Sequence, residues 1–432
     1  MNLARHLGAL GWAVAARLLP LISGLGIILL VIPHLSVAEF GRYSLIFNLA
    51  IFLILLNKSL ILNPTVKFGA EPRSLEESLQ AGLTLNAFFY LLMAVLLGLS
   101  DSFFHSLFRL ERGDILLVGI IPIAFLLRDW GFVFYQVRYQ MFRIFLLDSI
   151  YFIGIIVGYY LLVRWGFMHS AKQVIMINIV CAIASSLWAL GNVGISFPWR
   201  FTLDIRIINR IIGYGFSTLG LGLVGILLYT VDTAILGAIY HPEIVGIYSG
   251  GRSVYRVISL SITGLGTMVL PYASKLHSEG RTDELRALYE KVVGYLFVVL
   301  TIFALLLILF SESIFLFLFG ERYIASASVL QILCIGAPLE GIFTISSLLL
   351  YGAGWGKLVN RVALWVTALL PFLVFWGSYW AGPKGAALGM VITMTIGMWQ
   401  VMKTAHSLLG TSVFRIFNRV AVNIRTVLKS GI

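Results

Sequence analysis

Charged residues are scarce in this sequence. Asp, Glu, Lys and Arg make up 12% of its 432 residues, whereas hydrophobic residues make up 59%. The mean hydropathy is +0.96. Soluble globular domains carry about 25% charged residues, so this composition excludes an ordinary water-soluble protein. The expected solvent of the chain is lipid.

Long polar stretches are missing as well, which leaves no room for a sizeable soluble domain. Apolar runs of about twenty residues, enough to cross roughly 30 Å of hydrocarbon, recur along nearly the whole chain. Each run is continuously apolar, whereas barrel strands would alternate over ~10 residues. The sequence therefore predicts an all-α polytopic membrane protein of about twelve transmembrane helices. These helices are expected near residues 9–33, 40–62, 79–101, 113–137, 145–165, 172–194, 209–236, 243–270, 289–311, 323–352, 358–380 and 383–405.

Motifs of common enzymes are also absent from the sequence. It contains no P-loop, no HExxH zinc motif and no nucleophile elbow. Its two cysteines, Cys181 and Cys334, lie singly inside expected helices, where packing is a simpler role than a disulfide or a metal site. The outer loops are short, unlike those expected of a polytopic glycosyl transferase. We therefore expect a transporter with no cofactor rather than an enzyme.

The basic residues of the chain carry its topology signal. The formal net charge is +12, and basic residues near helix ends favour the cytoplasmic side. If the N-terminus is inside, roughly twenty basic residues lie in the cytoplasm and about seven lie outside. This distribution predicts that both termini are cytoplasmic. It also accounts for the net charge without a nucleic-acid partner, and no nucleic-acid-binding module is visible.

A short internal repeat suggests a duplicated architecture. Residues 38–44 (Ala-Glu-Phe-Gly-Arg-Tyr-Ser) and residues 242–249 (Pro-Glu-Ile-Val-Gly-Ile-Tyr-Ser) share Gly-x-Tyr-Ser in register. Each copy follows a glycine-rich helix and opens the next one. Because about six helices separate the copies, both enter the membrane in the same direction, as in a parallel repeat. We expect two six-helix lobes, 1–205 and 206–405, around a central cavity.

The last segment, 406–432, is expected to form a basic amphipathic tail in the cytoplasm. Its aromatic and aliphatic residues alternate with arginines and lysines. Such a segment lies at the membrane interface, where anionic lipid is its expected partner.

Four arginines lie inside expected helices: Arg17, Arg128, Arg252 and Arg256. A charged side chain within a span costs ~2.5–3.5 kcal/mol on insertion scales, so such residues usually face a protein interior or a water-filled cavity. Arg252 and Arg256 are four residues apart and share one helix face. Because guanidinium groups bind phosphate through two parallel hydrogen bonds, we predict a cationic cavity for an anionic substrate.

Internal ion pairing is the alternative role for these arginines. Asp232 is expected at a depth similar to that of Arg252, and Asp129 adjoins Arg128 in sequence. No carboxylate lies near the depth of Arg256 on its own helix, which favours a functional role for it. Asp232 and Glu340 could instead bind a coupling cation, since intramembrane carboxylates carry protons or Na⁺ in secondary transport. Asp148 is expected at the cytoplasmic interface.

Several helix-end motifs carry a family resemblance. They are residues 232–237 (Asp-Thr-Ala-Ile-Leu-Gly), 245–249 (Val-Gly-Ile-Tyr-Ser), Leu270-Pro271 with Ser274-Lys275, and 318–323 (Leu-Phe-Gly-Glu-Arg-Tyr). Together with Phe-Gly-Arg-Tyr-Ser at 40–44, they resemble polysaccharide flippases of the O-antigen type. Those proteins belong to the multidrug/oligosaccharidyl-lipid/polysaccharide exporter superfamily.

The resemblance implies a flippase of the bacterial inner membrane. Such a protein moves an undecaprenyl-pyrophosphate-linked oligosaccharide from the cytoplasmic to the periplasmic leaflet by alternating access, for surface polysaccharide biosynthesis. It implies that Arg17, Arg252 and Arg256 contact the pyrophosphate or acidic sugars. Polysaccharide assembly enzymes are further candidate partners.

Three other functions compete with this interpretation. A multidrug or other small-solute/cation antiporter of the same superfamily should carry carboxylates in its first lobe, and the first two expected helices contain no buried Asp or Glu. Peptidoglycan-precursor flippases typically have additional helices, which this length does not accommodate. A membrane glycosyl transferase or ligase is less favoured, because no catalytic loop is evident.

The topology can be tested with reporter fusions. Fusions after Arg73, Arg206 and Glu279 should report the cytoplasm, and a fusion after Leu110 should report the outside, because basic residues favour the inner side. A reporter after Glu279 that lies outside would reverse the second half relative to the first and contradict the parallel repeat.

Overall fold

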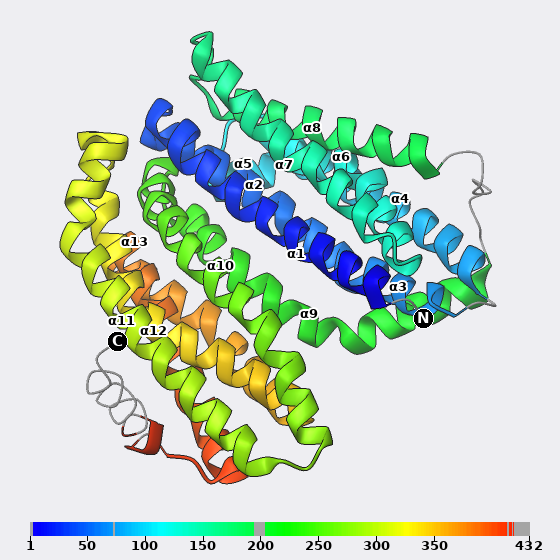
Figure 1. The fold of residues 1–432 in the computed structure, drawn as a ribbon. Helices are drawn as coiled ribbons and strands as arrows, with labels where there is room; N and C mark the ends of the chain where they lie inside the picture. The colour runs from blue at the N-terminus through cyan, green and yellow to red at the C-terminus, as the bar shows by residue number, and fades with distance from the viewer. Residues whose placement is uncertain (1–2, 72–73, 194–203, 413, 417, 419–432) are drawn as a thin grey trace. The chain divides into compact units, whose positions relative to one another are not determined.

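The computed structural model of the chain describes residues 3–71, 74–193, 204–412, 414–416 and 418. The described residues form helices joined by short turns, and none of them lies in a strand. The all-α fold predicted from the apolar runs is confirmed (Figure 1). Residues 419–432 lie outside the described part, and so does most of the expected amphipathic tail.

Each expected span corresponds to a helical segment in the structure. Most helix ends lie within a few residues of their expected positions. The α-helices are α1 (Leu3–Gly26), α2 (Val37–Asn57), α3 (Asn63–Gly69), α4 (Leu75–Leu99), α5 (Asp101–Phe108), α6 (Asp114–Val137), α7 (Met141–Arg164), α8 (Ala171–Val193), α9 (Ile205–Ile239), α10 (Pro242–Ser278), α11 (Thr282–Phe319), α12 (Ala325–Gly352) and α13 (Gly356–Leu409). The short helix α5 was not expected.

Ten segments of the described residues are long and apolar enough to cross a membrane. Two features bring this number to the twelve expected. Helix α13 contains two spans, because Ala381 and Gly382 have non-helical backbone angles and Pro383 follows them. Helix α10 is not among these ten segments, yet its 37 residues extend about 55 Å, which is long enough to cross a membrane.

The chain divides into two compact units, Met1–Ser249 and Gly250–Ile432. The division lies within α10, so the first unit includes α9, which packs on α2 and α4. The lobe boundary expected near residue 205 concerns the internal repeat and stays a prediction. A central cavity between two lobes also stays a prediction.

Helix α6 is the structural centre of the first unit. It packs against α4, α8 and α2, while α1 packs on α7. Trp130 and Phe134 of α6 are buried against Leu79, Leu83 and other apolar side chains. The indole Nε1 of Trp130 donates a hydrogen bond to the Leu79 carbonyl at 2.9 Å, which satisfies its polar group inside the core. In the second unit, α12 packs on both α11 and α13.

The second span of the first unit changes its helical geometry near its C-terminal end. After α2, residues Lys58–Leu62 form a π-helical turn, and α3 then begins with Asn63 and Pro64. Pro64 has no backbone N–H to donate to the Leu60 carbonyl four residues earlier, and its ring would crowd that carbonyl. The wider π turn relieves this conflict. Such turns are frequent at functional sites, and this one begins at Lys58.

The two copies of the repeated motif meet in the first unit. A Cβ atom added to Gly41 would lie 1.7 Å from the Pro242 carbonyl oxygen, and one added to Gly246 would lie 1.9 Å from the Val37 carbonyl oxygen. These two glycines occupy the same position of the Gly-x-Tyr-Ser repeat. The N-terminal turns of α2 and α10 therefore approach through backbone atoms, which only glycine permits.

We expect Gly41→Ala to destabilise the first unit by about 1–3 kcal/mol, because the methyl group meets backbone that cannot rotate away. The amount of monodisperse protein and its thermal midpoint in detergent would measure this loss. Gly24→Ala is the matched control, since a Cβ atom at Gly24 meets nothing within 4 Å. Equal stability of the two variants would contradict the close approach.

Candidate functional site

A cavity of about 510 Å³ lies inside the first unit. Its walls come from α1, from the C-terminal half of the second span, from α6 and from α7. The lining residues are Ala16, Arg17, Pro20, Lys58, Leu62, Asn63, Val66, Arg128, Asp129, Phe132, Val133, Gln136, Met141, Ile144, Asp148 and Phe152. This volume is within the roughly 300–1,000 Å³ of typical small-molecule sites.

The cavity concentrates charge in a chain that has little of it. Its lining contains three basic side chains, Arg17, Lys58 and Arg128, and two acidic ones, Asp129 and Asp148. The formal charge of the lining is therefore +1. Because isolated charges are costly within a membrane span, five of them around one cavity indicate a site that binds charged ligands.

Arg128 is held firmly by both carboxylates. Its Nη2 donates to Asp148 Oδ1 at 2.5 Å, and its Nη1 donates to Asp129 Oδ1 at 3.4 Å. The guanidinium also lies 5.0 Å from the centre of the Tyr151 ring. Only 8% of Arg128 is exposed. A buried guanidinium stays ionised and needs partners, so these contacts stabilise it in place.

Polar contacts between helices position this part of α6. Asn57 Nδ2 donates to Asn86 Oδ1 at 2.8 Å, and Asn86 Nδ2 donates to the Leu126 carbonyl at 2.9 Å. The Tyr90 hydroxyl donates to Asp129 Oδ2 at 3.2 Å. Side chains of α2 and α4 thus fix α6 one turn before Asp129, since buried amides in a span need partners.

Arg17 and Lys58 differ from Arg128 because they have no carboxylate partner among the described residues. Both side chains are exposed in the cavity wall. Lys58 Nζ lies 5.4 Å from the centre of the Phe132 ring. The two cations are therefore the groups of this cavity that remain available to an anionic ligand.

The structure brings together some of the residues predicted from the sequence. Arg17 and Arg128 line one cavity, and their role in substrate binding stays a prediction. The ion pair between Arg128 and Asp129, weighed from the sequence as the alternative, is present. Asp148 is buried and is the closer partner of Arg128, a contact that the sequence did not suggest, and its expected depth at the interface stays a prediction. The sequence analysis did not single out Lys58. The signal that could have identified it is a lysine inside an apolar run that continues beyond residue 62.

Glu340 belongs to the second unit, where it takes part in a polar contact. It accepts hydrogen bonds from the Tyr255 hydroxyl at 2.5 Å and the Ser259 hydroxyl at 3.1 Å. Arg252 is near enough to act electrostatically on Glu340. Helix α12 thus supplies a carboxylate beside the arginine-bearing part of α10, and the substrate role of Arg252 and Arg256 stays a prediction.

Asp232 is fully buried in α9 of the first unit. It accepts a hydrogen bond from the Tyr248 hydroxyl at 2.5 Å, and its Oδ1 accepts one from the Thr233 backbone N–H at 2.7 Å. Tyr248 is the tyrosine of the second Gly-x-Tyr-Ser copy. The predicted pair between Asp232 and Arg252 would join the two units and stays a prediction.

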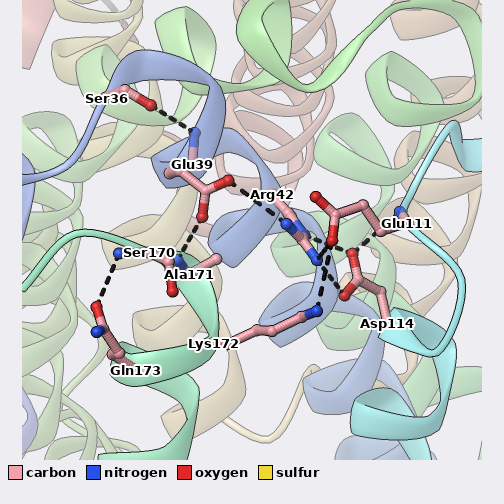
Figure 2. A network of polar contacts seen from close by, with 9 residues as sticks. All are labelled: Ser36, Glu39, Arg42, Glu111, Asp114, Ser170, Ala171, Lys172 and Gln173. Carbon is pink, nitrogen blue, oxygen red and sulfur yellow. Dashed lines mark hydrogen bonds and ion pairs between the residues drawn. The ribbon is translucent and has the colours of Figure 1, made fainter.

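A second ion cluster, which the sequence did not suggest, surrounds Arg42 at the start of α2 (Figure 2). Arg42 Nε and Nη2 donate to the two carboxylate oxygens of buried Asp114 at 2.5 and 2.6 Å. Nη2 also donates to Glu111 at 2.5 Å, and Nη1 donates to Glu39 at 3.4 Å. We call Glu39, Arg42, Glu111 and Asp114 the Arg42 cluster.

The Arg42 cluster ties three chain segments together. Glu39 Oε2 accepts a hydrogen bond from the Ala171 backbone N–H at 2.6 Å, which joins α2 to the first residue of α8 (Figure 2). Glu111 and Asp114 join α2 to the start of α6. The hydrogen bond from Arg42 lowers the pKa of Glu111 below its ordinary value of 4.5, partial burial opposes this shift, and Lys172 adds to it.

Comparison with known protein families identifies the chain. The model of a family described as polysaccharide biosynthesis proteins matches residues 34–328, which is more than half of the sequence. The chain belongs to this family. An uncharacterised membrane protein of Methanocaldococcus jannaschii is 28% identical over 147 residues, and the match covers 33% of this chain and 28% of that protein.

Solved structures of several transporters share this fold. The lipid II flippase MurJ in an inward closed conformation has a TM-score of 0.76 at 16% identity, covering 96% of this chain and 90% of that one. An inward-facing multidrug resistance transporter of the MATE family has a TM-score of 0.67 at 16% identity, covering 92% and 96%. A MOP superfamily transporter from Pyrococcus furiosus has a TM-score of 0.56 at 16% identity, covering 93% and 95%. The superfamily resemblance of the helix-end motifs is confirmed.

We expect the stabilising effect of Glu111 to depend on pH. Its pKa is lower in the folded protein than in the unfolded one, so its contribution is present above pH 4.5 and is lost as the pH falls through the lowered pKa. Thermal midpoints of the wild type and Glu111→Gln should differ at pH 7 and converge as the pH falls through the lowered pKa of Glu111. Glu77→Gln, at an exposed glutamate without an ion pair among the described residues, is the control. A difference that persists in acid would contradict the pairing.

Proposed function

We propose that this protein is a flippase that moves a polyprenyl-pyrophosphate-linked oligosaccharide between membrane leaflets for surface polysaccharide biosynthesis. Membership of the polysaccharide biosynthesis family and the exporter fold support a transporter for this class of lipid. The observation that carries the proposal is the charged cavity of the first unit, in which Arg17 and Lys58 have no carboxylate partner.

The chemistry of the cavity suits a pyrophosphate group. A lipid-linked headgroup must pass through a region where an unpaired anion is strongly disfavoured, so fixed cations there lower the cost of the passage. Arg17 can donate two parallel hydrogen bonds to phosphate, and Lys58 adds a mobile point charge. About 510 Å³ accommodates the pyrophosphate and its first sugar rather than a whole oligosaccharide. The remainder would extend outside this cavity.

The residues of the second unit have supporting roles in the proposal. Arg252 and Arg256 would contact the substrate from α10. Glu340 would bind a coupling cation, supported by its position beside two hydroxyl donors. Transport would run from the cytoplasmic to the periplasmic leaflet of the bacterial inner membrane, with both termini in the cytoplasm. Anionic lipids and polysaccharide assembly enzymes would be its further partners.

A multidrug antiporter is the second candidate, because MATE transporters share the fold. Cationic drugs need free carboxylates, and here both cavity carboxylates are engaged by Arg128. The formal charge of +1 also favours an anionic ligand over a cationic one. A membrane glycosyl transferase would form a new bond when supplied with lipid-linked glycan and an acceptor sugar, whereas a flippase would not.

We expect Arg17→Ala and Lys58→Ala each to lower glycan export per molecule by roughly ten- to a hundredfold, since a charge-assisted hydrogen bond contributes about 1.5–3 kcal/mol. The measurement is surface-glycan display in cells that lack the wild-type gene, normalised to the amount of the protein in the membrane. Arg17→Lys should keep part of the activity, because it retains the charge.

Arg206→Ala is the matched control, because its side chain is 91% exposed and far from the cavity lining. Arg256→Ala in the same assay tests the second unit. It should abolish export at normal protein abundance if Arg256 binds substrate, and should lower abundance if it is structural. Full export per molecule in both Arg17→Ala and Lys58→Ala would exclude this cavity as the headgroup site.

A further inference from the structure

The charged cavity has an unusual balance of acids and bases. Two carboxylates, Asp129 and Asp148, share the single guanidinium of Arg128. With Arg17 and Lys58 the lining sums to +1, whereas a pyrophosphate diester such as a lipid-linked headgroup brings two negative charges. Occupation would therefore leave a net charge of −1 in a cavity surrounded by apolar helices. A buried charge of this kind is costly unless another group neutralises it.

The two carboxylates are not equivalent. Asp148 accepts a 2.5 Å hydrogen bond from Arg128 Nη2, which stabilises its ionised form strongly. Asp129 is 3.4 Å from Arg128 Nη1, and its other oxygen accepts only from the neutral Tyr90 hydroxyl at 3.2 Å. Asp129 also lines the cavity, so an incoming anion would lie beside it. Protonation therefore removes a weaker charge-assisted hydrogen bond at Asp129 than it would at Asp148.

The charged and titratable groups around Asp129 come from every neighbouring helix. They are Arg17 of α1, Lys58 in the C-terminal half of the second span, Tyr90 of α4, Arg128 of α6, and Asp148 and Tyr151 of α7. Lys58 acts electrostatically on both carboxylates. When an anion neutralises Lys58 and Arg17, this support of the ionised Asp129 is lost.

We propose that binding of a pyrophosphate headgroup in this cavity is linked to the uptake of one proton by Asp129. The inference rests on the proposed function, and it assigns a second ligand, the proton, to the same site. The proton comes from bulk water and adds to a carboxylate oxygen of Asp129. Tyr90 is well suited to both states, because its hydroxyl donates to the ionised carboxylate and can accept from the protonated one. The occupied cavity is then neutral.

Linkage is reciprocal, so protonation of Asp129 must also strengthen anion binding. For one linked proton, the affinity should rise by up to tenfold for each unit that the pH falls. After release of the headgroup, the cavity returns to +1 and Asp129 gives up its proton.

The experiment is calorimetric titration of the full chain in lipid nanodiscs with farnesyl pyrophosphate. Titration in buffers of different ionisation enthalpy gives the number of protons taken up per bound ligand. Farnesyl pyrophosphate is a monoester whose terminal phosphate can itself exchange a proton on binding, so the uptake that belongs to the carboxyl group is the excess of the wild type over Asp129→Asn. We expect this excess to approach one proton near neutral pH. We expect the affinity of the wild type to depend more steeply on pH than that of Asp129→Asn.

Two further variants complete the test. Asp129→Glu keeps a titratable carboxyl and should keep the excess uptake, which also covers the case that Asp129→Asn fails to fold. Asp283→Asn removes a carboxylate that is 91% exposed and should behave as the wild type. Inorganic pyrophosphate in place of the farnesyl compound should bind more weakly with the same uptake, and so distinguishes a free anion from a lipid-borne one.

The failure of this inference and the failure of the proposed function give different results. Binding of farnesyl pyrophosphate by the wild type without excess uptake, or equal uptake by Asp129→Asn, would overturn the proton linkage and leave the flippase proposal intact. The absence of saturable binding to the wild type would overturn the headgroup site itself.

Discussion

Arg128 is a permanent cation inside a transmembrane helix, and the charged cavity depends on how this buried cation is held. Carboxylate oxygens of Asp129 and Asp148 lie 3.4 and 2.5 Å from its guanidinium nitrogens and neutralise its charge. Aromatic rings of neighbouring residues pack against the guanidinium group. Because removing one partner of a buried pair typically costs about 3–5 kcal/mol, α6 and α7 have little freedom to separate there. The pair therefore both closes the wall of the cavity and leaves Arg17 and Lys58 unneutralised.

The same constraint shapes the other end of the first unit. Arg42 is buried beside Asp114, and their bidentate contact joins the start of α2 to the start of α6. Helix α6 is thus fixed at its start by the Arg42–Asp114 pair and, in its second half, by the ion pairs of Arg128 together with the contacts of Asn86 and Tyr90. In a membrane, where apolar contacts do not favour protein over lipid, such polar contacts specify which helices pack together.

The helices were predictable from the sequence because each span is a local property. Continuous apolar runs identify twelve spans, and even the polar α10 could be recognised from its length. The ion pairs were harder to predict, since Arg42 and Asp114 are 72 residues apart and the turn at Arg138–Gln140 brings Asp148 back to Arg128. Lys58 lies four residues before the end of the expected span 40–62, and Pro64 and the π turn extend that span to Gly69, which places the lysine well inside it.

The repeated motif indicates why charge is unevenly divided along the chain. Both copies keep the glycine at which α2 and α10 approach through their backbones, and both keep the following tyrosine. The residue between them differs, since Arg42 in the first copy corresponds to Ile247 in the second. Tyr248 instead hydrogen-bonds to buried Asp232. A duplicated scaffold needs the glycine contact in both copies, whereas ionic partners can diverge freely. The first copy could therefore acquire a charge cluster that orients α6, and with it the cavity, while the second copy remained apolar at that position.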